Sequence, residues 1–316
     1  MDATAFLKGL TIQFFLGLVF SIVLQNRLFA QSDTLFIINC VDDRIKHLEP
    51  FDSDLIDGAG YSYLDLRCNG IYSLEDIDLS KARYIDLSRN PLSEFNNVKL
   101  NELEFINLSY TDLRYFPNSV CFAFNLKAIS INCSLSDLPD CLGGLKNLRS
   151  ITGLVAENKS ATNLDYLRKI ENLEHLGLLI LDFIPDNLCA LKLKKLELVI
   201  GKNINLTEVI EIISCFENLI ELKLVVSDKV LPENINLLKN LEVFIVQRDN
   251  PNSDDRLIYP ATVSELSKLK YLSDAKNLKD ISLSKGTTIL PLNNSDERKI
   301  KKLGYRIDRK HPLLKD

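Results

Sequence analysis

Residue types on which common activities depend are scarce in this chain. There are only three histidines, His47, His175 and His311, and no spacing places one beside a nucleophile and a base. No phosphate-binding loop and no paired metal ligands occur. The formal net charge is −5, which provides no electrostatic footprint for nucleic acid. These absences argue against an enzyme, a cofactor, a metal centre and nucleic-acid binding.

Glycine and linker-like segments are also scarce. The chain has 12 glycines among 316 residues, and no Pro-rich or Ser-rich linker interrupts it. A composition of 46% hydrophobic and 26% charged residues is ordinary for a globular protein and sufficient for a core. The sequence therefore predicts one folded unit rather than several.

The first thirty residues differ from the rest. Leu10–Leu24 is an apolar run of 15 residues, short for a membrane span of about 20. Lys8 precedes the run, and the run is followed by a small-residue cleavage sequence that ends at Ala30. We expect residues 1–30 to be a secretory signal peptide, so that the mature protein is secreted, periplasmic or at the cell surface. An uncleaved N-terminal membrane anchor is the alternative.

A repeat of 21 residues begins after this segment. Its rows are Tyr61–Ile71, Ala82–Leu92 and Leu103–Leu113. The aliphatic strand pairs fall in register: Leu64/Leu66, Ile85/Leu87 and Ile106/Leu108. Asn69, Asn90 and Thr111 also share one position. Self-similarity at a period of about 20–29 residues predicts a solenoid, in which each coil buries its leucines against the next.

The rows fit the pattern L-x-x-L-x-L-x-x-N-x-L and resemble the leucine-rich repeat family, here an exported and bacterial member. The resemblance implies a curved, right-handed α/β solenoid. Its parallel sheet lies on the concave face, and short helices or irregular coil form the convex face. The resemblance also implies that Asn69 and Asn90 belong to an internal ladder, in which the side chains bond backbone groups left unpaired by the turn.

The remaining chain divides around this solenoid. Residues 31–60, which contain the strand-like run Thr34–Val41, are expected to cap its N-terminal end. Residues 61–286 hold about ten strand positions, and residues 287–316 form a C-terminal cap with a basic tail. That tail is either a capping helix that starts near Asn294 or a basic interaction segment.

Later strands are expected to start at Leu126, Leu148, Leu173, Leu193, Leu219, Leu241 and Leu278. Helical spacing of apolar residues appears over Thr207–Phe216 and Thr262–Leu272. The polar segment Arg248–Arg256 is expected to be a surface loop.

Seven cysteines follow the leader: Cys40, Cys68, Cys121, Cys133, Cys141, Cys189 and Cys215. Their number is odd and no C-x-x-C motif occurs, which supports neither a zinc site nor a redox pair. We expect most of them to be small buried hydrophobic residues. The alternative is a bridge between neighbouring coils, such as Cys121–Cys141.

The outward residues of the strands should line the concave surface with which solenoids bind partners. In the first three rows they form a contact patch, a name kept below for these nine residues: Tyr63, Asp65, Arg67, Tyr84, Asp86, Arg89, Phe105, Asn107 and Tyr110. Exposed aromatic rings beside polar groups are typical of recognition surfaces. The alternative is that equivalent side chains on adjacent strands stack only to stabilise the sheet.

Later rows differ from the contact patch. Lys195, Glu197, Glu221 and Lys223 alternate in sign and predict a salt-bridged surface. The outward residues Val199, Val225, Val243 and Ile245 are either a second patch or a face that the Arg248–Arg256 loop covers.

The sequence therefore predicts a non-enzymatic repeat protein that binds an unknown protein or cell-surface macromolecule through its concave face. A membrane is involved only through the signal peptide or anchor. A surface adhesin or inhibitor on the same scaffold is the first alternative. A hydrolase that uses His175 is a remote one.

Overall fold

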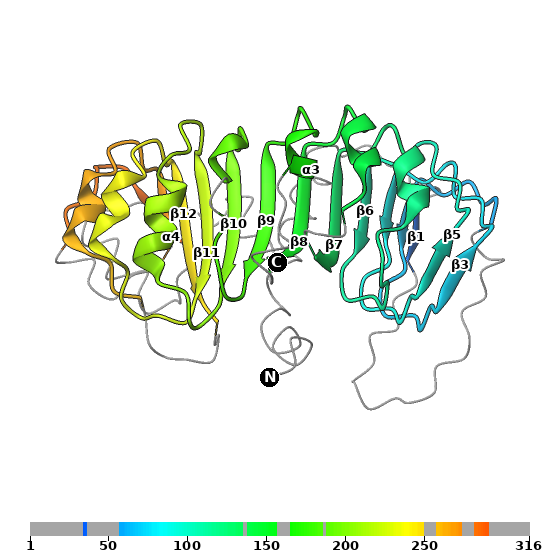
Figure 1. Cartoon of the computed structure of the whole chain (residues 1–316), viewed down its shortest axis with the longest axis horizontal. Coiled ribbons are helices and arrows are strands. Elements are labelled where there is room, and N and C mark those ends of the chain that lie inside the picture. Colours follow the sequence, from blue (N-terminus) through cyan, green and yellow to red (C-terminus); the bar gives the residue numbers. More distant parts are fainter. Residues whose placement is uncertain are drawn as a thin grey trace. The chain divides into compact units, whose positions relative to one another are not determined.

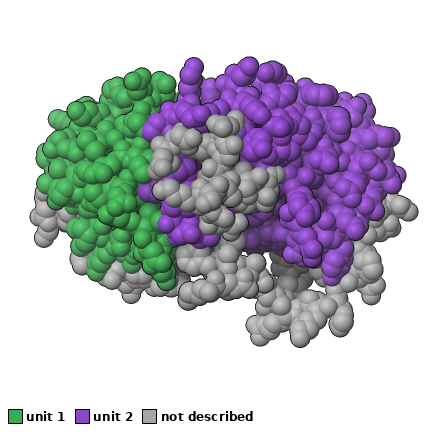
Figure 2. All heavy atoms as spheres, viewed as in Figure 1, with its two compact units in different colours: residues 1–28, 194–316 green, residues 29–193 purple. Residues whose placement is uncertain are grey.

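A computed structural model describes residues 34–36, 57–134, 138–156, 165–185, 188–249, 257–273 and 281–290. These residues pack as two compact units, an N-terminal unit within residues 29–193 and a C-terminal unit within residues 194–316 (Figure 2). The sequence predicts one folded unit, and this stays a prediction. Each coil of a solenoid contacts only its neighbours, so a stack of coils need not form a single compact body.

Several predictions concern residues outside those described. They are the signal peptide, most of the N-terminal cap, most of the loop after Arg248, the first residues of the strand expected at Leu278, and the C-terminal helix with most of the tail. The strand expected at Leu278 is wrong where it is described, because residues 281–287 form no strand and the strand of this coil is Thr288–Leu290.

The N-terminal unit contains a parallel sheet in which successive coils each contribute one strand (Figure 1). The strand order among the described residues is β1-β2-β4-β6-β7-β8-β9. The strands are β1 (Thr34–Phe36), β2 (Tyr63–Asp65), β4 (Tyr84–Asp86), β6 (Phe105–Leu108), β7 (Ala128–Ser134), β8 (Ser150–Ala156) and β9 (His175–Ile180).

The register of the first strands follows the 21-residue period. Tyr63 pairs with Tyr84, and Tyr84 pairs with Phe105. Since side chains alternate along a strand, the neighbouring residues point to the opposite face. Three leucines that follow these strands or end them, Leu66, Leu87 and Leu108, are each 0% exposed. The predicted solenoid packing is therefore confirmed.

The turn after β4 depends on the buried side chain of Asn90. Its Oδ1 accepts hydrogen bonds from the backbone N–H groups of Asn69 (2.7 Å) and Ile71 (3.1 Å). Its Nδ2 donates to the backbone oxygens of Leu66 (2.9 Å) and Leu87 (2.8 Å). The expected asparagine ladder is present, and it joins two consecutive coils.

The returning legs of the coils change character along the N-terminal unit. In the first coils they form a second parallel pair of strands, β3 (Ser73–Glu75) and β5 (Glu94–Asn96), which the sequence pattern did not predict. In later coils they form short helices: η3 (Asn118–Phe122), η5 (Asp140–Gly144), α3 (Asp165–Arg168) and η6 (Leu188–Ala190). Pro117 and Pro139 precede η3 and η5, where their restricted φ angle favours a helix start.

The register of the strands shifts in the middle of this sheet. The pairing of β7 with β8 shifts between Ser130 and Cys133, and the pairing of β8 with β9 shifts between Ile151 and Leu154. Gly153 lies at the shift with a φ of +86°, and a Cβ there would lie 2.6 Å from the Ile131 oxygen. Only glycine fits this position.

The C-terminal unit repeats the same plan. Its parallel strands are β10 (Lys195–Ile200), β11 (Glu221–Val226), β12 (Val243–Arg248), β13 (Tyr271–Ser273) and β14 (Thr288–Leu290). Its helical segments are α4 (Leu206–Ile213), η7 (Glu233–Leu237) and η8 (Ala261–Glu265). Figure 1 shows α4 as the longest of the labelled helices.

One of the two helix predictions in this unit is confirmed. The helix expected within Thr207–Phe216 is α4, and the Asn205 side chain caps it by accepting a hydrogen bond from the Thr207 N–H at 3.0 Å. The helix expected over Thr262–Leu272 is wrong in its second half, because η8 ends at Glu265 and β13 begins at Tyr271. The apolar residues with helical spacing are all buried: Val263, Leu266, Leu269 and Leu272. A 3₁₀ helix, a turn and a strand can therefore bury apolar residues at the same sequence spacing as an α-helix.

Within the part of the chain that the structure describes, no helix has the length and apolar character needed to cross a membrane.

Candidate functional site

The aromatic members of the contact patch form a stack on the outward face of the sheet. The ring centroids of Tyr63 and Tyr84 lie 4.2 Å apart with an interplanar angle of 1°. Those of Tyr84 and Phe105 lie 4.8 Å apart at 13°. Adjacent strands are about 4.8 Å apart, so rings at equivalent positions meet face to face. The sequence correctly predicts that these three side chains lie side by side.

The exposure of these rings differs from the prediction. Tyr63, Tyr84 and Phe105 are only 8%, 5% and 6% exposed. Burial raises the pKa of the Tyr63 hydroxyl to about 12 and raises that of Tyr84 further. The expectation of exposed rings is wrong, and the stacking covers the ring faces that meet. This burial favours a stabilising role for the stack itself.

A polar column runs beside the rings. Arg67 donates from Nε to Asp65 Oδ1 at 2.8 Å and from Nη2 to Asp65 Oδ2 at 2.7 Å, a bidentate ion pair. Asn107 Nδ2 donates to Asp86 Oδ2 at 3.1 Å, and Asp86 Oδ1 accepts from the Ser88 N–H at 2.9 Å. Asp65, Asp86 and Asn107 are buried, and Arg67 is half-buried. These contacts bring the polar patch residues together as the register predicts.

Burial raises the pKa of the Asp86 carboxyl group, and the nearby Asp65 charge acts in the same direction. A raised carboxyl pKa means that the folded state binds the proton more tightly than the unfolded chain. The stabilising effect of that proton is therefore lost as the pH rises from about 4, the unfolded pKa, through the folded pKa.

Replacement of Asp86 by Asn should remove this pH dependence. The wild type should lose stability between pH 4 and pH 7, whereas Asp86→Asn should not lose this contribution. The free energy of unfolding of the variant minus that of the wild type is therefore expected to increase over this pH range. Denaturant unfolding at several pH values measures this difference. Thr152→Ser, at the same position three strands further on, is the control, since it carries no titrating group. A difference that stays constant with pH would contradict the assignment.

The most accessible member of the contact patch lies in the turn after β4. Arg89 is exposed, and its guanidinium carbon lies 6.0 Å from the centroid of the Tyr110 ring, a cation–π contact. Arg89 and Tyr110 occupy equivalent positions in consecutive coils, and both have left-handed backbone conformations, with φ angles of 58° and 60°. Cys68 occupies the same position in the preceding coil, also with a φ of 58°.

The column that contains the aromatic stack continues across the unit as small and polar residues. Ala128, Ser150 and His175 follow Phe105 in register. Ser150 Oγ and His175 Nδ1 are hydrogen-bonded at 2.7 Å, and both residues are buried. Ser150 and His175 are directly paired on β8 and β9, so the strand register is sufficient to explain this contact.

The predicted salt-bridged surface is present in the C-terminal unit. Lys195 pairs with Glu221 at 2.8 Å and with Glu197 at 3.5 Å, and Lys223 pairs with Glu197 at 3.8 Å. All four side chains are half-buried. Desolvation lowers the pKa of the Lys223 ammonium. The four charges balance, so this lattice presents no net charge to a partner.

The apolar outward residues of this unit are mostly covered. Val225 and Ile245 are buried, and Val199 and Val243 are half-buried. They therefore offer little apolar area as a second patch.

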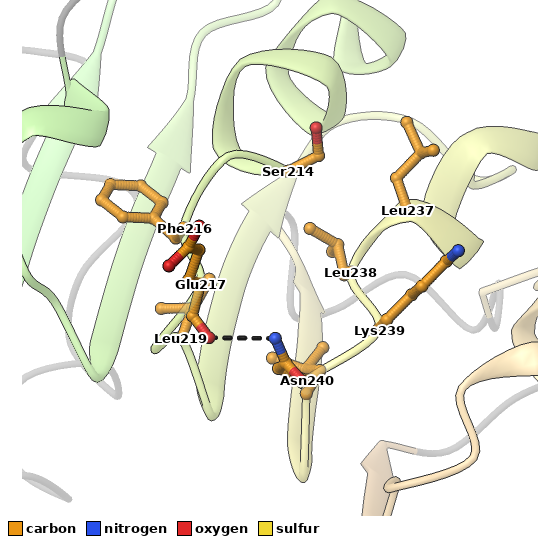
Figure 3. Close-up of a pocket in the computed structure, with 9 residues that line it drawn as sticks. Ser214, Phe216, Glu217, Leu219, Leu237, Leu238, Lys239 and Asn240 are labelled. Carbon is orange, nitrogen blue, oxygen red and sulfur yellow. Dashed lines mark hydrogen bonds between the residues drawn. The ribbon is translucent and has the colours of Figure 1, made fainter.

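A shallow crevice in the C-terminal unit was not predicted. It has a volume of about 200 Å³ and lies between the coil that precedes β11 and the coil that precedes β12 (Figure 3). Phe216, Leu219 and Leu238 line it, and Asn240 Nδ2 donates to the Glu217 oxygen across it at 2.9 Å. Its size is below the range of about 300–1,000 Å³ that is usual for small-molecule sites.

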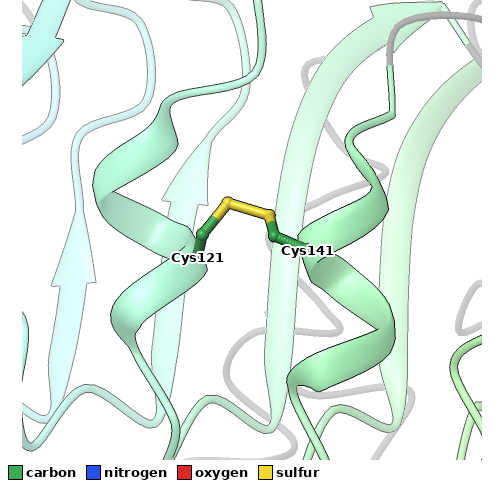
Figure 4. Close-up of a disulfide and its surroundings, with 2 residues drawn as sticks. All are labelled: Cys121 and Cys141. Atoms are coloured by element: carbon green, nitrogen blue, oxygen red, sulfur yellow. A yellow bond between two sulfur atoms is a disulfide. The ribbon is translucent and has the colours of Figure 1, made fainter.

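The cysteine prediction needs a correction. Cys121 in η3 and Cys141 in η5 form a disulfide with a Cα–Cα distance of 5.6 Å, which links neighbouring coils (Figure 4). Cys68, Cys189 and Cys215 are also disulfide-bonded, whereas Cys133 is a half-buried thiol. The expectation of buried thiols is thus wrong for these residues, and the alternative of a bridge between coils is confirmed for Cys121 and Cys141.

A second asparagine ladder was missed by the sequence reasoning. Asn125, Asn147 and Asn172 each donate from Nδ2 to a backbone oxygen of the preceding coil, at 3.1, 3.0 and 2.8 Å. The signal was the Asn-Leu dipeptide that lies one residue before several strands. These bonds hold consecutive turns together at one edge of the sheet.

Coils of parallel strands, leucines in register and asparagines that bond the turns define the class of fold: the chain folds as a leucine-rich repeat solenoid. No family model matches it, and no curated protein matches it.

Solved structures with a similar arrangement are leucine-rich repeat proteins. One is a leucine-rich repeat protein of Leptospira interrogans, with 16% identity over 82% of this chain and 80% of that one, and a TM-score of 0.35. Another is an internalin of Listeria monocytogenes, with 15% identity over 74% and 78% of the two chains and a TM-score of 0.36. A third is the repeat domain of the type III effector XopL, with 15% identity over 71% and 76% and a TM-score of 0.27.

Proposed function

We propose that this protein is a non-enzymatic recognition module that binds a protein or another cell-surface macromolecule. The proposed site is the contact patch, the sheet face of β2, β4 and β6 together with the turns that follow these strands. In this site the buried stack and the polar column form a rigid base, and the exposed Arg89, beside the half-buried Tyr110 ring, makes the accessible contact. A surface adhesin or an inhibitor would use the same geometry.

The observation that carries the proposal is the backbone conformation of Arg89 and Tyr110. A left-handed conformation costs a residue with a side chain about 1–2 kcal/mol, and glycine avoids that cost. The chain nevertheless places an exposed arginine and a half-buried tyrosine at these equivalent positions. Strain of this kind is concentrated at functional sites, and Arg and Tyr are enriched among residues that dominate binding.

Replacement of Arg89 by Gly should separate stability from binding. The unfolding free energy is expected to stay the same or to rise by up to about 1 kcal/mol, because the positive φ is relieved. Capture of a partner from cell-envelope or host-cell extracts by the immobilised protein is expected to fall about tenfold. Quantitative mass spectrometry of the captured proteins, with Lys285→Ala as an exposed control in the C-terminal unit, measures the change.

Undiminished capture by both Arg89→Gly and Tyr110→Ser would contradict the proposed site. The buried rings are unsuitable for this test, since their removal would also disturb the sheet.

We also place the protein outside the cytoplasm, with cleavage of the signal peptide near Ala30. The Cys121–Cys141 disulfide supports this location, because such bonds persist in oxidising compartments. Intact-mass measurement of the protein recovered from its native host tests the cleavage: a chain that starts near Gln31 supports it, and an intact leader favours the anchor.

The Ser150–His175 hydrogen bond is the observation that favours the remote alternative, a hydrolase. If it were a catalytic pair, the wild type would hydrolyse activated esters and Ser150→Ala would not. We expect no turnover above background for either protein.

A further inference from the structure

A second surface of the N-terminal unit has a charge pattern of its own. Five two-residue turns precede the strands β4, β6, β7, β8 and β9: Ser80–Lys81, Asn101–Glu102, Phe124–Asn125, Lys146–Asn147 and Glu171–Asn172. They stack in order, because the Glu102 N–H donates to the Ser80 oxygen at 3.2 Å and the second asparagine ladder links the others. This row of turns is called the turn edge below.

An aromatic side chain lies at the centre of the turn edge. Phe124 is 63% exposed, and Phe122, two residues earlier at the end of η3, is 70% exposed. Next to Phe122, in the following coil, Gly144 has open space where a Cβ would stand. Exposure of phenylalanine rings to water is unfavourable in free energy. Two such rings beside a glycine, which has no side chain to block access, are suited to contact with another apolar surface.

The charges on either side of Phe124 alternate. Before it come Lys81 and Glu102, paired at 3.2 Å, and after it come Lys146 and Glu171, paired at 3.3 Å. Lys81 and Glu102 are the second residues of their turns, whereas Phe124, Lys146 and Glu171 are the first residues of theirs. With one residue taken from each turn, the signs along the row are positive, negative, aromatic, positive and negative. All four charged side chains are between 48% and 70% exposed.

This order is self-complementary under a two-fold rotation. If a second copy lies antiparallel with its Phe124 opposite the first Phe124, Glu102 of each copy faces Lys146 of the other. Lys81 of each copy likewise faces Glu171 of the other. All four cross-contacts then join opposite charges, whereas a parallel arrangement would place like charges together. An interface in which one patch meets itself is the isologous contact of a two-fold dimer.

A neighbouring row of charges at the start of the strands follows the same symmetry except at its centre: Arg83, Glu104, Lys127, Arg149 and Glu174. The rotation places Arg83 opposite Glu174 and Glu104 opposite Arg149. The two copies of Lys127 face one another with like charge, and the ammonium of each is already bonded to Glu104 of its own chain at 2.5 Å.

We propose that the turn edge binds a second copy of this chain in an antiparallel, two-fold arrangement centred on Phe124. The five turns span four strand spacings, about 19 Å, so the contact belongs to the small interfaces that form weak dimers. This surface is separate from the contact patch, and the proposal does not depend on the proposed function.

Charge reversal tests the proposal directly. The purified full chain is studied by sedimentation velocity over a range of concentrations, and the wild type is expected to show a reversible dimer. Glu102→Lys places lysine opposite Lys146, and Lys146→Glu places glutamate opposite Glu102. Each variant alone is expected to raise the dimer dissociation constant at least about tenfold. Both side chains are exposed, so the fold should be unaffected.

Two further samples restore the opposite charges. The double variant Glu102→Lys/Lys146→Glu should dimerise like the wild type. An equimolar mixture of the two single variants should form heterodimers, since each new lysine then faces a new glutamate. Phe124→Ser should weaken every dimer, and Lys202→Glu, in the C-terminal unit, should have no effect. A wild type that stays monomeric, or single variants that dimerise normally, would overturn the proposal.

Discussion

Replacement of Asn90 by Ala is expected to lower the free energy of unfolding by about 3–5 kcal/mol. The side chain satisfies the N–H groups of Asn69 and Ile71 and bonds the oxygens of Leu66 and Leu87. Alanine would leave these buried groups without partners, and each unsatisfied group costs about 1–3 kcal/mol. Chemical denaturation measures the loss.

Two comparisons make this prediction specific. Asn90→Asp keeps both acceptor bonds but loses both donor bonds, so it should still be strongly destabilising. Asn96→Ala, on the exposed strand β5 of the same coil, removes one exposed contact to Glu75 and should cost less than about 0.5 kcal/mol. A loss below about 1 kcal/mol for Asn90→Ala would mean that water replaces the ladder.

Removal of the Cys121–Cys141 disulfide is expected to lower the stability of the N-terminal unit by about 3 kcal/mol. The bond closes a loop with a sequence separation of 20 residues, and the chain entropy of such a loop accounts for a loss of that size. For a unit of this size the melting temperature should fall by about 6–12 °C.

The double variant Cys121→Ser/Cys141→Ser avoids an unpaired thiol and is the one to compare with the wild type by calorimetry. Cys133→Ser, which alters a half-buried thiol in β7, is the control and should shift the melting temperature far less. Peptide mapping of the wild type without reductant should recover the Cys121 and Cys141 peptides joined. Their recovery as separate thiol peptides would contradict the assigned bridge.

The repeat pattern was sufficient to predict which residues are neighbours in the first three coils. Leu66, Leu87 and Leu108 are buried at equivalent positions because strand alternation and the 21-residue period leave no other register. The stack of Tyr63, Tyr84 and Phe105 follows from the same period. Asn90 was predicted to bond the turn, since its side chain combines a donor and an acceptor at that position.

Exposure could not be predicted in the same way. Tyr63 and Tyr84 point away from the leucine core, yet they are buried. Strand alternation predicts the direction of a side chain, whereas its exposure also depends on the distance and tilt between neighbouring strands. The sequence also did not indicate that Arg89 and Tyr110 take positive φ angles, since neither residue favours them.

The sequence suggested the Cys121–Cys141 bridge only as an alternative to buried thiols. Val120 in η3 and Leu142 in η5 are buried at equivalent positions of their coils. Cys121 follows Val120, whereas Cys141 precedes Leu142, so the two cysteines are not at equivalent positions. Comparison of repeats by spacing therefore does not align the two cysteines. Their approach to a Cα–Cα distance of 5.6 Å is a result of how the two 3₁₀ helices are turned.

The sequence by itself determined the repeat, the burial of its leucines and the order of the strands, because these depend on local alternation and on a regular period. The tertiary structure alone decided which outward side chains remain accessible, which cysteines meet, and that the described residues form two compact units. These properties arise from contacts between coils, whose distances and angles are not encoded at any single position of the repeat.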